Sequence, residues 1–237
     1  SIQFGDIDIS KDKQSLREIL GYLPQEFGVY PKVSASDLLD HMAVMKGITN
    51  SKQRKEVVGS LLQQTNLWEA KDRKLGTYSG GMKQRFGIAQ ALIGDPKLII
   101  VDEPTAGLDP MERNRFHNLL SEIGENVIVI LSTHIVDDVS DLCNNMAIIL
   151  DGEVRMVGEP IELIKRLDGK VWKGLIEKSK LKEIEKENEV ISSRLYLGKI
   201  QVRIFSESRL EDFEQTTPEI EDLYFATIRG LDIQGVE

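Results

Sequence analysis

The chain has 237 residues, 41% hydrophobic and 29% charged, an ordinary globular composition with enough apolar material for a core. A formal net charge of −9 argues against a nucleic-acid-binding surface, and the single cysteine, Cys143, excludes an internal disulfide. No apolar run approaches the roughly 18 residues needed to cross a bilayer, so we expect any membrane role to go through a partner. We expect Cys143 to be a buried structural thiol in a reducing compartment.

A hairpin and a further short strand are predicted near the start of the chain. Residues 1–10 alternate apolar and polar side chains around a Gly-Asp turn, which is typical of a hairpin. Ile19 to Leu23 form the second strand candidate, which Pro24 ends and Gln25 follows directly. Gln25 is therefore expected at the end of a strand.

From residue 31 to residue 94 the apolar spacing becomes helical. Ser34, followed three residues later by Asp37, resembles a capping box at a helix start. A later helix is predicted from about Gly81 to Ile93, because its apolar residues fall on one face. The block therefore predicts a helical lobe inserted into the fold.

The segment LIIVDEPTAGLDP, from Leu98 to Pro110, combines a strand with polar groups at its end. An uninterrupted apolar run is typical of a strand buried on both faces of a parallel sheet. It ends in Asp102 and Glu103, at the edge where open α/β sheets bind ligands. Asp109, followed by Pro110, predicts the next helix start.

Further strands and helices alternate after this segment. Val127 to Leu131 predict a second buried strand, which runs into His134 after two polar residues. A short helix, a hairpin turning at Asp151-Gly152 and a helix over 160–167 follow. The alternation indicates an α/β core. Residues 170–237 differ in composition and apolar pattern, and they predict a small α+β appendage with its own hairpin and a last helix.

Four local signals have to be considered together. Ser79, Gly80 and Gly81 precede a helix, where backbone N–H groups and a hydroxyl suit a phosphate. The others are the Asp102-Glu103 pair, His134 and Gln25, each following a predicted strand. Alone, a helix start or a lone histidine is more often structural.

In this order and spacing, the segments SGG, IIVDEPTAGLDP and STH resemble the ATP-binding domain of ABC transporters. The resemblance implies an α/β, P-loop NTPase-like core over 1–169 with a helical subdomain at about 31–94. It leaves 170–237 as a small α+β extension. The tail TTPEIEDLYFATIRG is similar to the C-terminal extension of exporter-type members, including those for antibiotics and multidrug efflux.

The resemblance also implies roles for the polar residues at the strand ends, with ATP and Mg²⁺ as cofactors. Asp102 matches the aspartate that holds Mg²⁺, usually through water, and Glu103 the general base that polarises the attacking water. Gln25 matches the glutamine that senses Mg²⁺ and the γ-phosphate. His134 matches the histidine that contacts the γ-phosphate.

The remaining matches imply a dimer. Ser79, Gly80 and Gly81 match the signature loop that closes over ATP held by a second ATP-binding subunit, and Asp109 matches the D-loop aspartate. The family's phosphate loop, G-x-x-x-x-G-K-[ST], has no match in the chain. We therefore expect an N-terminally truncated sequence, whose 237 residues alone would be inactive as an ATPase.

The leading hypothesis is an ATP-hydrolysing subunit of an exporter. It would be cytoplasmic and peripheral on the inner face of the cell membrane, coupling dimer closure to transport by separate permease subunits. The helical lobe would carry the coupling surface. Two alternatives remain open: a non-catalytic fragment or regulatory binding module, and a soluble, non-transport ABC ATPase. No nucleic-acid partner is expected.

Overall fold

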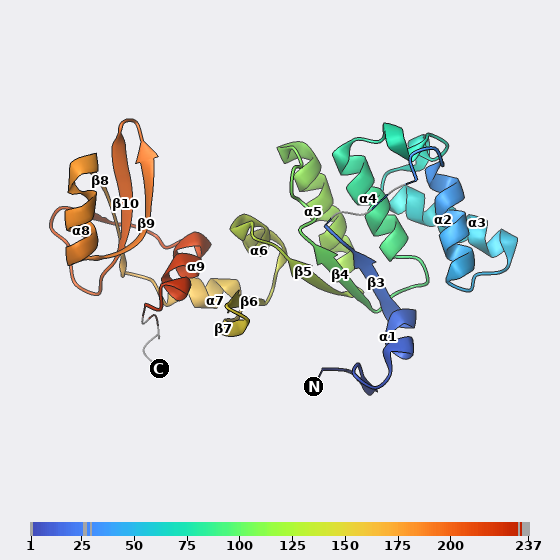
Figure 1. The fold of residues 1–237 in the computed structure, drawn as a ribbon, viewed down its shortest axis with the longest axis horizontal. Coiled ribbons are helices and arrows are strands. Elements are labelled where there is room, and N and C mark those ends of the chain that lie inside the picture. The colour runs from blue at the N-terminus through green and yellow to red at the C-terminus, as the bar shows by residue number, and fades with distance from the viewer. Residues whose placement is uncertain (1, 26–27, 29, 232, 234–237) are drawn as a thin grey trace. The chain divides into compact units, whose positions relative to one another are not determined.

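The computed structural model describes residues 2–25, 28, 30–231 and 233. These residues fall into two compact units, unit 1 (Ser1–His134) and unit 2 (Ile135–Glu237) (Figure 1). The predicted boundary between ATPase domain and extension, at 169/170, lies inside unit 2 and stays a prediction. In the part of the chain that is described, no helix is both long and apolar enough to span a membrane.

The centre of unit 1 is a three-stranded parallel sheet in the order β3-β4-β5. Its strands are β3 (Leu20–Leu23), β4 (Leu98–Asp102) and β5 (Ile128–Ser132). The middle strand, β4, buries Ile99 and Val101 completely on one face, whereas on the other face Leu98 is buried and Ile100 is only half-buried. The predicted burial on both faces is therefore confirmed in part. All three strands point their carboxyl ends to the same edge of the sheet, as an α/β fold requires.

The prediction that the strand around Val127–Leu131 is buried was wrong. Its side chains alternate between half-buried and exposed, and Ile128 and Ile130 remain 57% and 51% exposed. The reason is that the face of β5 that carries Ile128, Ile130 and Ser132 is left uncovered by the described residues. β5 is also an edge strand, with β4 as its only neighbour among the described strands. A run of apolar residues indicates a strand but does not show how many of its sides are covered.

The predicted helical lobe is present beside the sheet (Figure 1). Its helices are α2 (Ala35–Met45), α3 (Ser51–Gln64) and α4 (Gly80–Ala91), with short 3₁₀ turns at Trp68–Ala70 and Leu75–Thr77. The predicted cap is confirmed, since Ser34 Oγ accepts from Asp37 N at 3.2 Å. Leu39, Leu62 and Phe86 are almost fully buried where the three helices meet.

The remaining elements of unit 1 are a small separate hairpin and two helices. The predicted hairpin consists of two short antiparallel strands, and an unpredicted helix precedes β3; their bounds are β1 (Gln3–Phe4), β2 (Ile7–Asp8) and α1 (Lys13–Ile19). Helix α5 (Pro110–Gly124) packs on β5 and α4 and buries an apolar face of Phe116, Leu119, Leu120 and Ile123.

Unit 2 begins with a helix, a hairpin and a second helix. Their bounds are α6 (Val136–Leu142), β6 (Met146–Leu150), β7 (Glu153–Gly158) and α7 (Pro160–Lys165). Both residues of the predicted turn, Asp151 and Gly152, have positive φ angles of 53° and 78°. A two-residue turn of that kind matches the twist of the strands it joins.

The rest of unit 2 is an antiparallel sheet in the order β11-β8-β10-β9 with helices on its faces. The elements are β8 (Val171–Ile176), a 3₁₀ turn (Lys178–Lys180), α8 (Leu181–Glu187), β9 (Glu189–Tyr196), β10 (Lys199–Phe205), β11 (Glu214–Gln215) and α9 (Ile220–Ile228). One apolar cluster joins the sheet to α8 and another joins it to α7 and α9. The predicted hairpin and last helix are thereby confirmed.

Candidate functional site

Three of the predicted site residues meet at the carboxyl edge of the parallel sheet. Glu103 Oε2 accepts a hydrogen bond from Gln25 Nε2 at 2.7 Å, and Glu103 Oε1 lies 2.9 Å from His134 Nδ1. The three side chains follow β3, β4 and β5 respectively, so residues distant in sequence share one site. The Glu103 side chain is 27% exposed and that of His134 is 67% exposed, so water has access to both.

The backbone around Glu103 is held in an unusual conformation. Its φ is +43°, in the left-handed region that non-glycine residues adopt only when the surroundings require it. Its N–H donates to the carbonyl of Ser132 at 2.9 Å, which continues the β4–β5 hydrogen-bonding pattern one residue past the strand. The carboxylate is thus fixed both by its own backbone and by the two side chains that contact it.

Asp102 occupies the last position of β4, opposite Ser132 on β5. The Ser132 hydroxyl donates a short hydrogen bond to Asp102 Oδ1. This contact occupies one carboxylate oxygen and leaves Oδ2 for another partner. Sequence reasoning named Ser132 only as part of a strand end and gave it no role. The feature that identifies Ser132 is its position opposite Asp102 in the β4–β5 pairing.

The loop after Glu103 ends at a capped helix. Gly107 takes a positive φ of 74°, where glycine has no steric cost. Asp109 then caps α5, since its Oδ1 accepts from Glu112 N at 2.9 Å, and Pro110 stands in the first turn. The predicted cap at Asp109 is confirmed, whereas its role toward a nucleotide stays a prediction.

Ser79, Gly80 and Gly81 lie at the N-terminus of α4. Ser79 is the N-cap, and its hydroxyl oxygen accepts from Met82 N at 3.2 Å. Gly81 permits a close approach between two helices, because a Cβ there would lie 2.2 Å from Glu112 Oε2 of α5. Ser79 and Gly80 are exposed, so backbone N–H groups at this helix end are open to solvent. Neither residue belongs to the Glu103 cluster.

Two residues that sequence reasoning missed hold α4 against α5. Arg85 Nη1 of α4 lies 2.5 Å from Glu112 Oε2 of α5, and their side chains are only 9% and 16% exposed. Glu112 also contacts Arg115 at 2.7 Å. The pair fixes the helix that begins with Ser79 relative to the helix that begins after Asp109. A basic and an acidic residue on separate helices give no sequence signal of such a contact.

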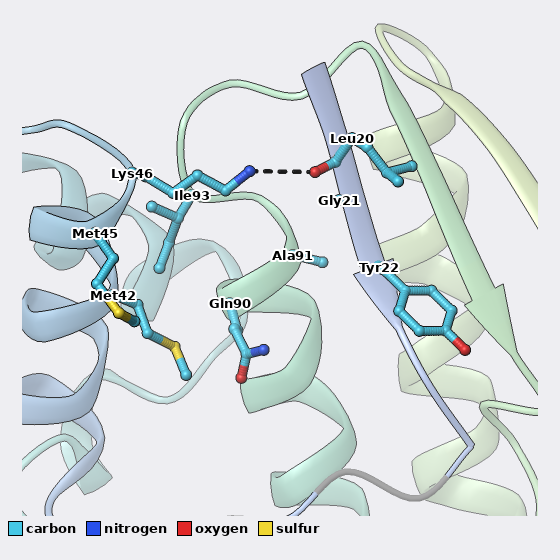
Figure 2. A pocket seen from close by; sticks show the side chains of 9 residues that line it. All are labelled: Leu20, Gly21, Tyr22, Met42, Met45, Lys46, Gln90, Ala91 and Ile93. Atoms are coloured by element: carbon cyan, nitrogen blue, oxygen red, sulfur yellow. Dashed lines mark hydrogen bonds between the residues drawn. The ribbon is translucent and has the colours of Figure 1, made fainter. Parts of the chain in front are cut away.

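A hollow of about 270 Å³ lies between β3 and the helical lobe, apart from the Glu103 cluster (Figure 2). Its walls include Tyr22 of β3, Met42 and Met45 of α2, and Gln90 of α4. Lys46 closes one end by donating to the carbonyl of Leu20 at 3.3 Å. The hollow is mainly apolar, and Tyr22 and Met45 are 49% and 67% exposed.

Comparison with known proteins shows which family the sequence is similar to. A family model described as "ABC transporter" matches residues 1–106. The "Uncharacterized ABC transporter ATP-binding protein YxlF" of Bacillus subtilis (strain 168) is 32% identical over 243 residues, which cover 95% of this chain and 81% of that protein. The chain belongs to the family of ABC transporter ATP-binding proteins. The match to YxlF includes most of the segment after residue 169.

Two other relatives match a smaller share of this family member. The "Linearmycin resistance ATP-binding protein LnrL" of Bacillus subtilis (strain 168) is 34% identical over 170 residues, which are 71% of this chain and 54% of that protein. The "Probable multidrug ABC transporter ATP-binding protein YbhF" of Escherichia coli (strain K12) is 34% identical over 164 residues, 69% of this chain and 28% of that protein. The chain therefore spans about half or less of these two relatives.

Proposed function

We propose that this ABC transporter ATP-binding protein hydrolyses ATP to drive an exporter. One observation supports this most: the Glu103 carboxylate is held between Gln25 and His134, next to Asp102 and open to water. A carboxylate that two polar groups orient can take a proton from an attacking water. The names of two relatives, one for linearmycin resistance and one for probable multidrug transport, support export as the direction.

The residues at the sheet edge fit the cofactors that the family implies. With Gln25 Nε2 directed at Glu103, its Oε1 is the amide atom left to bind a cation, and Asp102 retains one oxygen. Oxygen donors of this kind suit Mg²⁺, which takes one or two protein ligands and completes its shell with water and phosphate oxygens. A bound Mg²⁺ would neutralise charge on the ATP phosphates. We propose Asp102 and Gln25 as its protein ligands and His134 as a contact to the terminal phosphate.

We propose a second ATP-binding subunit as a partner. Ser79 and Gly80 present a helix N-terminus, whose partial positive charge and free N–H groups favour a phosphate. None of the hydrogen bonds described above joins this end of α4 to Glu103. We therefore propose that the N-terminus of α4 and the Glu103 cluster contact two different nucleotides. Asp109 would lie at the same interface.

Permease subunits are the proposed second kind of partner, and they would hold the protein at the inner face of the cell membrane. The hollow of Figure 2 offers a contact surface at the edge of the helical lobe, since Met45 of α2 and Tyr22 of the neighbouring β3 expose apolar groups around it. Flexible methionine side chains adapt to a partner surface. Purification from detergent-solubilised membranes tests this proposal: a stoichiometric integral membrane protein should accompany the chain, and its absence would contradict the proposal.

The catalytic proposal is tested with Glu103→Gln. Because the 237 residues contain no G-x-x-x-x-G-K-[ST] segment, the assay uses the product of the complete reading frame. We expect ATP turnover to fall about 100-fold or more, the usual effect of losing a general base, while an ATP-dependent dimer persists in size-exclusion chromatography. Glu122→Gln, an exposed position on α5, is the matched control and should leave turnover unchanged. Equal turnover in the two variants would remove Glu103 as the base.

A further inference from the structure

Tyr78 stands directly before Ser79, the residue that caps helix α4, and it is almost fully buried in the helical lobe. The residue is 5% exposed, and it belongs to the same apolar cluster as Phe86 of α4. Its hydroxyl donates a hydrogen bond to the carbonyl of Ala70 at 2.8 Å. Burying a hydroxyl costs free energy unless the hydroxyl is paired. Tyr78 therefore adds a directed contact at a position that an apolar side chain could fill without one.

The acceptor of this hydrogen bond is itself fixed within the lobe. Ala70 ends a 3₁₀ turn, and its carbonyl also accepts from the backbone N–H of Arg73 at 2.9 Å. The carbonyl of the next residue, Lys71, accepts from the N–H of Ser36 in the first turn of α2 at 3.0 Å. The Tyr78 hydroxyl is thus bonded to a part of the lobe that its own backbone hydrogen bonds hold in place.

Arg73 makes two further contacts with the segment before Ser79. Its guanidinium lies 6.0 Å from the centre of the Tyr78 ring, and its Nη2 donates to the carbonyl of Thr77 at 3.2 Å. Burial raises the pKa of the Tyr78 hydroxyl and outweighs the opposite effect of the Arg73 charge, so the hydroxyl keeps the proton that it donates. The chain just before Ser79 is therefore held by a buried hydrogen bond and by an exposed one.

These contacts set the direction in which the chain enters α4. Tyr78 and Ser79 are both extended, with φ and ψ of −75° and 143° and of −65° and 168°, and the helix begins at Gly80. Gly80 and Gly81 have no side chains that could anchor the helix start. Tyr78 therefore supplies the side-chain anchor on the N-terminal side of Ser79.

We propose that Tyr78 is a positioning residue for the ATPase. Through its hydrogen bond to Ala70, it fixes the direction of the Ser79 hydroxyl and of the N–H groups of Gly80 and Gly81. This role rests on the proposed function, in which the N-terminus of α4 contacts a nucleotide held by a second ATP-binding subunit. Tyr78 is buried and does not itself touch that nucleotide.

Tyr78→Phe removes the hydroxyl and keeps the ring, so it tests the hydrogen bond alone. In the product of the complete reading frame, kcat/KM for ATP should fall about 2- to 10-fold, the range that corresponds to one hydrogen bond. The Kd of ATP for the undimerised subunit should stay unchanged, because the change leaves the Glu103 cluster intact. A residue that only stabilised the fold would not separate these two constants.

Thr65→Val is the matched control, because it deletes the same kind of hydrogen bond in the same lobe. Thr65 is 1% exposed, and its hydroxyl donates to the carbonyl of Leu61 at 2.8 Å at the end of α3. Both variants should lower the thermal midpoint by a similar amount, but Thr65→Val should leave kcat/KM unchanged. Equal values of kcat/KM in the two variants would overturn the proposal, because the Tyr78 hydroxyl would then serve stability alone.

Hydrogen exchange followed by mass spectrometry gives a readout that needs no ATP. In the 237-residue chain, Tyr78→Phe should speed amide exchange in residues 75–83, whereas Thr65→Val should not. Unchanged exchange in Tyr78→Phe would contradict the anchoring role even where ATP hydrolysis is confirmed. Absence of ATP turnover in the unsubstituted complete protein would instead contradict the proposed ATPase, and the exchange rates would still decide whether Tyr78 holds this segment.

Circular dichroism checks that each variant is folded. If Tyr78→Phe fails this check, Arg73→Gln replaces it, because Arg73 is exposed and holds the same segment through Thr77. Unchanged kcat/KM and unchanged exchange in a folded Arg73→Gln variant would equally count against the proposed role.

Discussion

Replacing Gly81 by alanine should separate helices α4 and α5, whereas the same change at Gly80 should not. A Cβ on Gly81 would lie 2.2 Å from Glu112 Oε2, 2.7 Å from its Cδ and 2.8 Å from its Cγ. At Gly80 the nearest atom is Leu108 Cδ2 at 4.0 Å, an ordinary contact. The two glycines are neighbours on one helix, so they form a matched pair that differs in the space around each.

The size of the effect follows from the ion pair with Arg85 that Glu112 would lose. Glu112 cannot move away from a new methyl group without leaving Arg85, with which it forms a pair whose side chains are 9% and 16% exposed. Breaking a buried pair costs about 3–5 kcal/mol, and alanine regains about 1 kcal/mol over glycine inside a helix. Gly81→Ala should therefore lose about 2–4 kcal/mol of unfolding free energy, and Gly80→Ala should be neutral or gain up to about 1 kcal/mol.

Urea unfolding followed by circular dichroism measures both values in the 237-residue chain. A double-mutant cycle with Glu112→Ala identifies the cause: in that background the carboxylate is gone, so Gly81→Ala should add little further loss. Equal stability of the Gly80 and Gly81 variants would refute the reasoning. So would a Gly81→Ala penalty that is unchanged by removing Glu112, because the clash would then lie elsewhere.

Two further predictions concern other parts of the fold. Gly21→Ala should destabilise unit 1 by about 3 kcal/mol or more in the same urea assay, because its Cβ would lie 2.3 Å from the backbone oxygen of Ala91, which cannot rotate away. Gly59→Ala is the control, since the nearest atom to its Cβ lies at 3.6 Å. Equal stability of the two variants would contradict this prediction. Burial, and then the negative charge of Asp138, raise the pKa of the Cys143 thiol, so less thiolate is present at a given pH than in an unfolded chain. Cys143 is half-buried, not fully buried as expected from the sequence. Iodoacetamide at about pH 8 should still alkylate it more slowly than an unfolded chain, and urea should accelerate the reaction; equal rates with and without urea would count against the raised pKa.

Local signals in the sequence predicted the elements well, because caps and turns depend on neighbouring residues. Ser34, Ser79 and Asp109 each cap the helix that follows them, as their residue types indicated. The turn at Asp151-Gly152 has the positive φ angles that such a pair favours. In each case the side chain and the backbone group it contacts lie within four residues, so no knowledge of the fold was needed.

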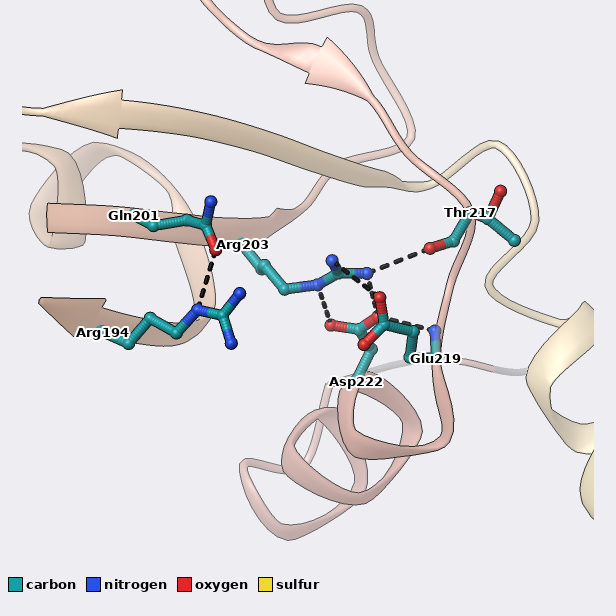
Figure 3. Close-up of polar contacts among 6 residues, drawn as sticks. All are labelled: Arg194, Gln201, Arg203, Thr217, Glu219 and Asp222. Carbon is teal, nitrogen blue, oxygen red and sulfur yellow. Dashed lines mark hydrogen bonds and ion pairs between the residues drawn. The ribbon is translucent and has the colours of Figure 1, made fainter. Parts of the chain in front are cut away.

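Contacts between distant segments could not be predicted in the same way. Nothing in the local pattern shows that Arg85 and Glu112 lie 2.5 Å apart, since each also suits an exposed helix face. Exposure of Ile128 and Ile130 was missed for a related reason, because an apolar run looks the same in a central strand and an edge strand. The hydrogen bond from Arg194 to Gln201 likewise depends on the strand register, which pairs the two residues (Figure 3).

The Glu103 cluster depends on strand register more than on the residues themselves. Asp102 is opposite Ser132 in the parallel pairing, and the next backbone contact, from Glu103 N to Ser132 O, sets the direction of the acidic side chain. His134 follows Ser132 by two residues and reaches the same carboxylate from β5, while Gln25 reaches it from β3. A shift of one residue in either pairing would turn these side chains to the other face of the sheet. The apolar residues that fix the register are therefore part of the catalytic arrangement that we propose, although they supply none of its polar groups.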